Sequence, residues 1–72
     1  MESQIPQQGT HHWVLTLDLP NSVRVTDFGT YTPLPNTTRH DAFTVIRESF
    51  IEQHPQLARA SVLFFSLEPN DL

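Results

Sequence analysis

The sequence predicts an α+β domain in which two strands, a helix and a third strand follow one another, so that a three-stranded sheet carries the helix on one face. Three patterns predict this ββαβ order. Apolar and polar residues alternate over 12–19, a helical period follows Thr38, and four consecutive apolar residues occupy 62–65. Prolines and small polar residues separate these segments, as is typical of turns and loops.

The length of the chain allows one domain. The protein has 72 residues, and a single domain usually needs about 50 or more. Residues 1–10 are polar and glutamine-rich, so they are predicted to form a disordered tail ahead of a single domain at 11–72. A domain of this size buries only about 60% of its unfolded surface, and the chain has no cysteine to cross-link it. Packing against a partner would therefore add much to its stability.

Residues 12–19 are predicted to form the first strand, because apolar residues recur at every second position. This apolar row consists of Trp13, Leu15, Leu17 and Leu19. Pro20 and Asn21 favour a reversal of the chain. Residues 22–32, rich in valine, threonine and aromatic side chains, are then expected to return as an antiparallel strand.

The second strand contains a glycine, which often marks a bulge or a close backbone approach. A bulge or twist is therefore expected near Phe28 and Gly29. The prolines at positions 33 and 35 then form a stiff loop in which the chain crosses to the helix.

The helix is predicted to begin after Thr38, whose hydroxyl is suited to cap it, with Asp41 three positions further on. At 100° per residue, Phe43, Ile46 and Phe50 share one stripe, which is expected to pack on the sheet. The helix ends before Pro55, which has no N–H to donate. Two further apolar residues of the helix, Val45 and Ile51, lie about 100° or more from the stripe and are added to the candidate interface residues.

Residues 61–67 are predicted to form the third strand, and their apolar run places apolar side chains on both faces. The preferred strand order is 2-1-3, because the first strand carries the most complete apolar row and so suits the centre of the sheet. The order 1-2-3 is the alternative.

A single helix covers only one face of this sheet. If Leu63, Phe65 and Leu67 face the helix, the opposite face carries apolar residues with nothing over them. These residues are Val14, Val62, Phe64 and Phe28. A contiguous patch of this kind marks an interface, and a homodimer joined sheet to sheet is the expected geometry.

Charge argues against nucleic acid as the partner. Eight acidic residues against four basic ones give a net charge of −4, whereas binding to a phosphate backbone needs clustered positive charge. A weak nucleic-acid-binding regulator remains the alternative, and it would use the four arginines, Arg24, Arg39, Arg47 and Arg59. The sequence contains no apolar run of about 18 residues and no signal-peptide pattern, so a cytoplasmic protein without membrane contact is expected.

The sequence offers little for catalysis or for metal binding. Histidines occur at positions 11, 12, 40 and 54, and none has the spacing of a zinc site. The chain has no cysteine and no lysine, and a layer pair of about 60 residues rarely encloses a substrate pocket. No catalytic residue, metal or cofactor is predicted, and a small hydrolytic enzyme ranks third among the function classes.

Three stretches resemble small uncharacterised proteins of actinomycetes and their mobile elements. They are residues 11–17 (HHWVLTL), 32–39 (TPLPNTTR) and 62–70 (VLFFSLEPN). The resemblance covers nearly the whole chain from residue 11 and carries no known activity. It implies a free-standing small cytoplasmic protein. Together with the residue patterns it favours a non-enzymatic interaction or regulatory module that self-associates or binds a protein partner through its uncovered sheet face.

Overall fold

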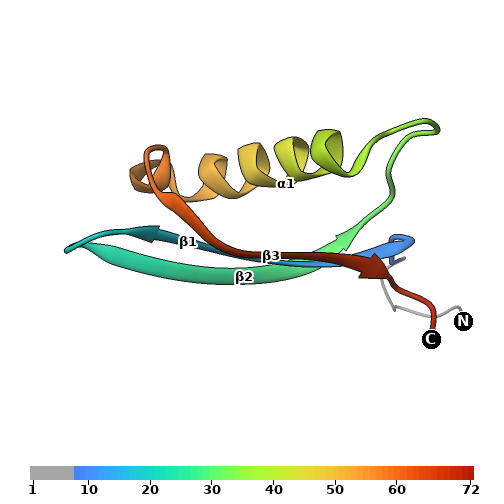
Figure 1. Cartoon of the computed structure of the whole chain (residues 1–72), viewed down its shortest axis with the longest axis horizontal. Helices are drawn as coiled ribbons and strands as arrows, with labels where there is room; N and C mark the ends of the chain where they lie inside the picture. The colour runs from blue at the N-terminus through green and yellow to red at the C-terminus, as the bar shows by residue number, and fades with distance from the viewer. Residues whose placement is uncertain (1–7) are drawn as a thin grey trace, which may run out of the picture.

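The computed structural model describes residues 8–72, which form a three-stranded sheet with one helix layered on it (Figure 1). The elements in chain order are β1 (His11–Leu19), β2 (Val23–Tyr31), α1 (Arg39–Gln53), the 3₁₀ turn η1 (Pro55–Leu57) and β3 (Ser61–Pro69). The strands lie in the order β2-β1-β3, and both neighbouring pairs are antiparallel. The predicted α+β class and the preferred strand order are confirmed. Residues 1–7 of the predicted tail lie outside the described residues.

Residues 8–10 are hydrogen-bonded to the ends of the two outer strands. The N–H of Gly9 donates to Oγ1 of Thr30 at 3.0 Å. The N–H of Asn70 donates to the carbonyl of Thr10 at 2.8 Å, and the Asn70 side chain donates to the carbonyl of Gly9 at 3.1 Å. These bonds join the chain just before β1 to the chain just after β3.

β1 is the central strand because its apolar row reaches from one end to the other. Leu15 and Leu17 are fully buried, and Trp13 and Leu19 pack against the same core. Side chains alternate between the two faces of a strand, so this row faces α1 and the even-numbered residues of β1 face the other way.

Both sharp turns of the described chain use a proline followed by an asparagine. Asn21 and Asn36 have φ angles of 63° and 67°. In each turn the residue after the asparagine donates its N–H to the carbonyl before the proline, at 3.0 Å for Ser22 and 3.1 Å for Thr37. Proline fixes the first central position and asparagine tolerates positive φ at the second, so the sequence specifies both reversals.

The irregularity of the sheet lies in β3, and the bulge predicted near Phe28 and Gly29 is wrong. β1 and β2 pair without a shift of register along their whole length. On the other side of β1, Thr16 pairs with Phe64 but Leu17 pairs with Val62, which leaves one extra residue in β3.

The glycine in β2 serves a close approach instead. Gly29 pairs with Trp13 of β1, and a methyl group built on Gly29 would stand 3.1 Å from Cζ2 of the indole. The large aromatic side chain of β1 therefore fits over β2 because its partner has no side chain.

The helix begins and packs largely as the sequence predicts. Oγ1 of Thr38 accepts the N–H of Asp41 at 3.1 Å, which caps the first turn. Ile46 and Phe50 are buried, and so is Ala42, which lies one turn before Ile46. Phe43 is partly buried and meets Phe65 of β3 edge to face, with ring centroids 4.9 Å apart.

The segment between α1 and β3 contains a 3₁₀ turn that contributes to the core. Pro55 ends α1 and starts η1, and Leu57 of that turn is fully buried in the core. Ala60, just before β3, is also buried. The single 3₁₀ turn thus closes the end of the core that α1 leaves open.

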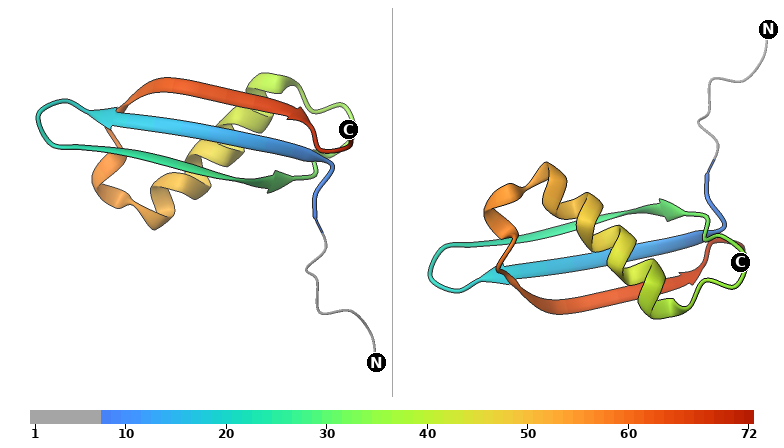
Figure 2. Two further views of the ribbon diagram at one scale, coloured as in Figure 1. Left: turned by 90° about the horizontal axis from the view of Figure 1, so that it is seen from below. Right: turned by 90° about the horizontal axis from the view of Figure 1, so that it is seen from above.

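α1 crosses the sheet diagonally. Its first turns lie over the end of β3 and its last turns lie toward β2, as the two views of Figure 2 agree. The helix therefore covers the second half of β3 better than the first half. In agreement, Phe65 and Leu67 are partly buried, while Val62, Leu63 and Phe64 are exposed.

Candidate interaction surface

The face of the sheet turned away from α1 is bare over the described chain (Figure 1). We call it the open face. Its four cross-strand rows, from one end to the other, are Thr30–His12–Glu68, Phe28–Val14–Ser66, Thr26–Thr16–Phe64 and Arg24–Asp18–Ser61. All three strands contribute to each row, so the face is a continuous surface.

The middle of the open face is apolar. Phe28 of β2 stands directly opposite Val14 of β1, and Phe64 of β3 occupies the next row. Phe28 and Phe64 are 69% and 54% exposed, and Val14 is half-buried between the two outer strands. The structure thus brings together three of the predicted interface residues.

Polar pairs surround this apolar middle. The hydroxyls of Thr16 and Thr26 lie 2.7 Å apart. At one end Nε of Arg24 donates to Oδ1 of Asp18 at 3.2 Å, and at the other end the ring of His12 lies 6.3 Å from that of Phe28. The open face therefore has an apolar centre and a polar rim, which is the usual composition of a protein interface.

The bulge in β3 separates Val62 from the row in which simple alternation predicts it. Val62 pairs with Leu17, whose side chain faces the helix layer, while Phe64 pairs with Thr16 of the open face. Val62 is nevertheless 44% exposed, and the extra residue Leu63 is 52% exposed. Simple alternation places Leu63 on the helix side and does not predict its exposure, because no local signal marks the bulge.

The two helix residues added to the candidate interface have different surroundings. Val45 is 46% exposed, but it belongs to α1 and so lies in the layer opposite the open face. Ile51 is partly buried and packs against the core. Neither residue joins Val14 and Phe64 on one surface, so the predicted six-residue interface divides between the two layers.

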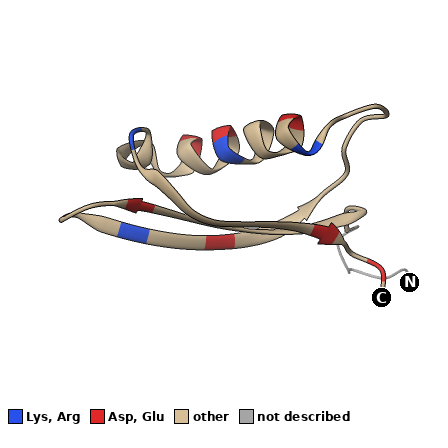
Figure 3. Cartoon of the chain, in the orientation of Figure 1, with Lys and Arg blue, Asp and Glu red and all other residues tan. Residues whose placement is uncertain are grey.

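The four arginines do not form one basic surface. Arg24 is paired with Asp18 on the open face, and Nη2 of Arg47 donates to the carbonyl of Ala58 at 3.1 Å. The guanidinium carbon of Arg39 lies 5.2 Å from the ring centroid of Phe65, within the range of a cation–π contact. Figure 3 shows the basic segments dispersed among acidic ones.

The histidines of the chain do not gather either. Within residues 8–72, no group of three or more histidine, aspartate and glutamate side chains is placed to hold a metal ion. His54 packs beside Phe50, with ring centroids 5.2 Å apart, at the end of α1. His40 lies at the other end of the helix.

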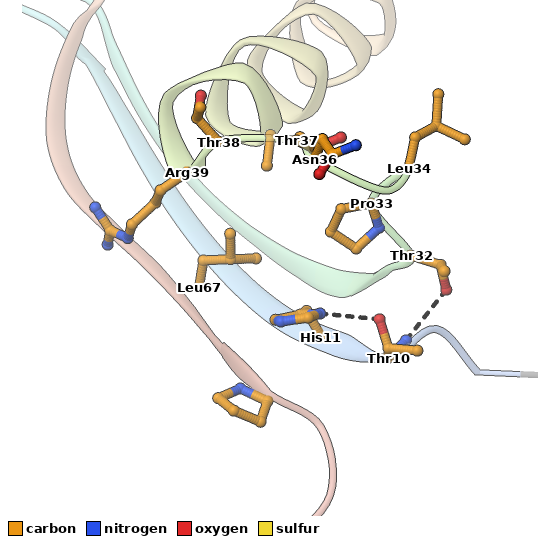
Figure 4. Close-up of a pocket in the computed structure, with 12 residues that line it drawn as sticks. Thr10, His11, Thr32, Pro33, Leu34, Asn36, Thr37, Thr38, Arg39 and Leu67 are labelled. Atoms are coloured by element: carbon orange, nitrogen blue, oxygen red, sulfur yellow. Dashed lines mark hydrogen bonds between the residues drawn. The ribbon is translucent and has the colours of Figure 1, made fainter.

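A hollow of about 460 Å³ lies where the β2–α1 loop meets the ends of β1 and β3 (Figure 4). Its lining includes Thr10, His11, Thr32, Arg39 and Leu67. Nδ1 of His11 is hydrogen-bonded to Oγ1 of Thr10 at 2.9 Å, and the N–H of Thr10 donates to Oγ1 of Thr32 at 3.1 Å.

Oγ1 of Thr10 beside Nδ1 of His11 resembles a nucleophile beside a base, an arrangement in which a third group usually orients the base. None of the described residues that line the hollow is acidic. The bond from the N–H of Thr10 to Oγ1 of Thr32 joins the start of β1 to the chain just after β2.

Comparison with protein-family models, with curated proteins and with solved structures found no match to the chain. The likeness to small actinomycete proteins therefore stays a prediction. Across the described residues, α1 is 15 residues long, and no helix is both long and apolar enough to span a bilayer.

Proposed function

We propose that the protein is a small non-enzymatic interaction module that binds a second copy of itself through its open face. The supporting observation is the apolar cluster of Val14, Phe28 and Phe64, which is continuous across three strands of a bare face. Large apolar patches on small domains are typical of interaction sites.

The energy available from covering this face is large for so small a domain. Burying about 300 Å² of apolar surface at about 25 cal/mol per Å² contributes about 7.5 kcal/mol before the cost of association. The total stability of small domains is of the same order. Association through this face would therefore compensate for much of the stability that a short chain lacks because it has few residues to bury.

A second copy suits the open face because the polar groups at its two ends are complementary: one end carries a carboxylate and the other an imidazole, which can donate a hydrogen bond to it. Asp18 lies in the row at one end of β1 and His12 in the row at the other end. When two open faces stack with their β1 strands antiparallel, Asp18 of each copy meets His12 of the other. The apolar middles then overlap, and a twofold axis relates the two copies, as in most soluble oligomers.

Phe28→Glu tests this function. Phe28 is 69% exposed, so the substitution leaves the core unchanged, but it puts a carboxylate into the middle of the stacked faces, where burial of an unpaired charge is costly. The mass in solution, measured by size-exclusion chromatography with light scattering at neutral pH, is expected to halve.

Val45→Glu is the matched control, because it also replaces an exposed apolar residue but lies on α1. It is expected to leave the mass unchanged. A wild-type protein that stays a monomer at high concentration, or a Phe28→Glu variant with the wild-type mass, would contradict the proposed function.

Two further expectations from the sequence stay predictions. Binding of a nucleic-acid duplex through the arginines would have to fall steeply with salt, and filter binding at two salt concentrations tests it. The cytoplasmic location is the second of them.

A further inference from the structure

β3 is an edge strand, and its outer edge pairs with no other strand of the described chain. Unpaired backbone groups along an edge are a template for another strand. Many proteins protect such an edge with lysine or with inward-pointing charge. Positions 61–67 of β3 carry no charged residue, so charge does not protect this edge, and the bulge at Leu63 is its one interruption within these positions.

The first half of β3 is also bare on both faces. Val62, Leu63 and Phe64 are 44%, 52% and 54% exposed. The diagonal course of α1 toward β2 leaves the helix-side face of this half uncovered (Figure 2), and Phe64 projects from the open face. Three consecutive exposed apolar residues thus lie along an unpaired edge.

The charges at the two ends of this run have opposite signs. Arg59 lies just before β3, and Glu68 lies near its end, with Asp71 beyond it. All three residues are exposed. Figure 3 shows β3 uncharged between the basic segment at its start and the acidic segment at its end.

We propose that β3 pairs antiparallel with β3 of a second copy, so that two sheets join edge to edge into one of six strands. Pairing centred near Phe64 and Phe65 puts Arg59 of each copy beside the acidic end, Glu68 and Asp71, of the other. Parallel pairing of the same segment would set arginine against arginine and acid against acid. Charge therefore selects the antiparallel arrangement, which a twofold axis closes.

This edge contact is separate from the stacking of open faces. Phe28 lies on β2, at the opposite edge of the sheet, and takes no part in β3 pairing. The twofold axis of the edge contact is perpendicular to the sheet, and the axis of face stacking runs between the two stacked sheets, parallel to their planes. The two contacts together would close a tetramer with three perpendicular twofold axes.

Charge reversal at the two ends of β3 tests the inference. Arg59→Glu and Glu68→Arg each create like-charge contacts at both ends of the paired strands, and each is expected to weaken the edge contact about tenfold. The double variant Arg59→Glu with Glu68→Arg restores opposite charges and is expected to recover the wild-type dissociation constant. Sedimentation velocity over a concentration series at low salt measures these constants.

Glu52→Arg is the control, because it makes the same charge change as Glu68→Arg on the exposed surface of α1. It is expected to change nothing. The inference is overturned if either single reversal leaves association unchanged, or if the double variant fails to recover it.

Phe28→Glu separates this inference from the proposed function. Edge pairing alone predicts that Phe28→Glu keeps the wild-type mass and that the charge reversals lower it. Face stacking alone predicts that Phe28→Glu lowers the mass and that the charge reversals leave it unchanged. That result would contradict the edge contact and support the proposed function. Both contacts together predict that Phe28→Glu and Arg59→Glu each halve the mass and that their combination yields a monomer.

Discussion

At the scale of single residues, the same dipeptide serves two purposes in this chain. Pro20-Asn21 and Pro35-Asn36 form tight turns in which asparagine takes a positive φ. Asn70, which follows Pro69, instead hydrogen-bonds the carbonyls of Gly9 and Thr10. The conformational preferences of proline and asparagine account for the two turns. The role of Asn70 comes from its hydrogen bonds to the chain just before β1.

The contact of Gly29 with Trp13 leads to a stability prediction. In Gly29→Ala, the new methyl group lies 3.1 Å from Cζ2 of the indole, so either the ring or the strand must shift. We expect the free energy of unfolding to fall by about 1–2 kcal/mol, as is typical of overpacking. Urea unfolding followed by circular dichroism measures this change.

A smaller ring at position 13 provides the control for that substitution. Trp13→Phe removes the atoms nearest to Gly29, so Gly29→Ala should cost less in that background. Equal costs in the two backgrounds would show that the destabilisation does not come from the indole contact.

At the scale of elements, the short turn η1 completes the core. α1 runs diagonally, so its stripe cannot cover both ends of β1. Leu57 of η1 fills the remaining end and is fully buried, although it stands alone in a polar stretch of sequence. Leu57 thus covers the end of the core that a further turn of α1 would otherwise have to cover.

Truncation of this leucine tests the role of η1. Leu57→Ala is expected to lower the free energy of unfolding by about 3 kcal/mol, because it leaves a cavity in a fully buried site. The neighbouring Gln56 is exposed, so Gln56→Ala should change the free energy of unfolding by less than about 0.5 kcal/mol. Urea midpoints of the two variants give the comparison, and a similar small loss for both would show that η1 does not support the core.

At the scale of the whole molecule, one core is shared between two layers that do not match in extent. The sheet has two faces and two edges, and the single helix covers one face incompletely (Figures 1 and 2). Four of the exposed apolar residues lie on the open face and on the first half of β3, namely Phe28, Val62, Leu63 and Phe64. Association is the physical consequence proposed for this mismatch.

Much of the architecture follows from patterns within short stretches of sequence. The alternating row from Trp13 to Leu19 correctly predicts the central strand, and Thr38 correctly predicts the helix cap. The bulge in β3 and the burial of Leu57 were not predictable in this way. Both arise from contacts with distant parts of the chain, and neither leaves a signal in the residues beside it.

Local sequence patterns account for which residues form strands, where the helix begins and where the chain reverses, because periodicity, capping and turn chemistry are local properties. They also show that the apolar residues exceed what one helix covers. The position of this excess depends on tertiary packing. The diagonal path of α1 and the extra residue Leu63 place it on the open face and along the edge of β3, because packing between elements fixes crossing angle and register, and these depend on the whole fold.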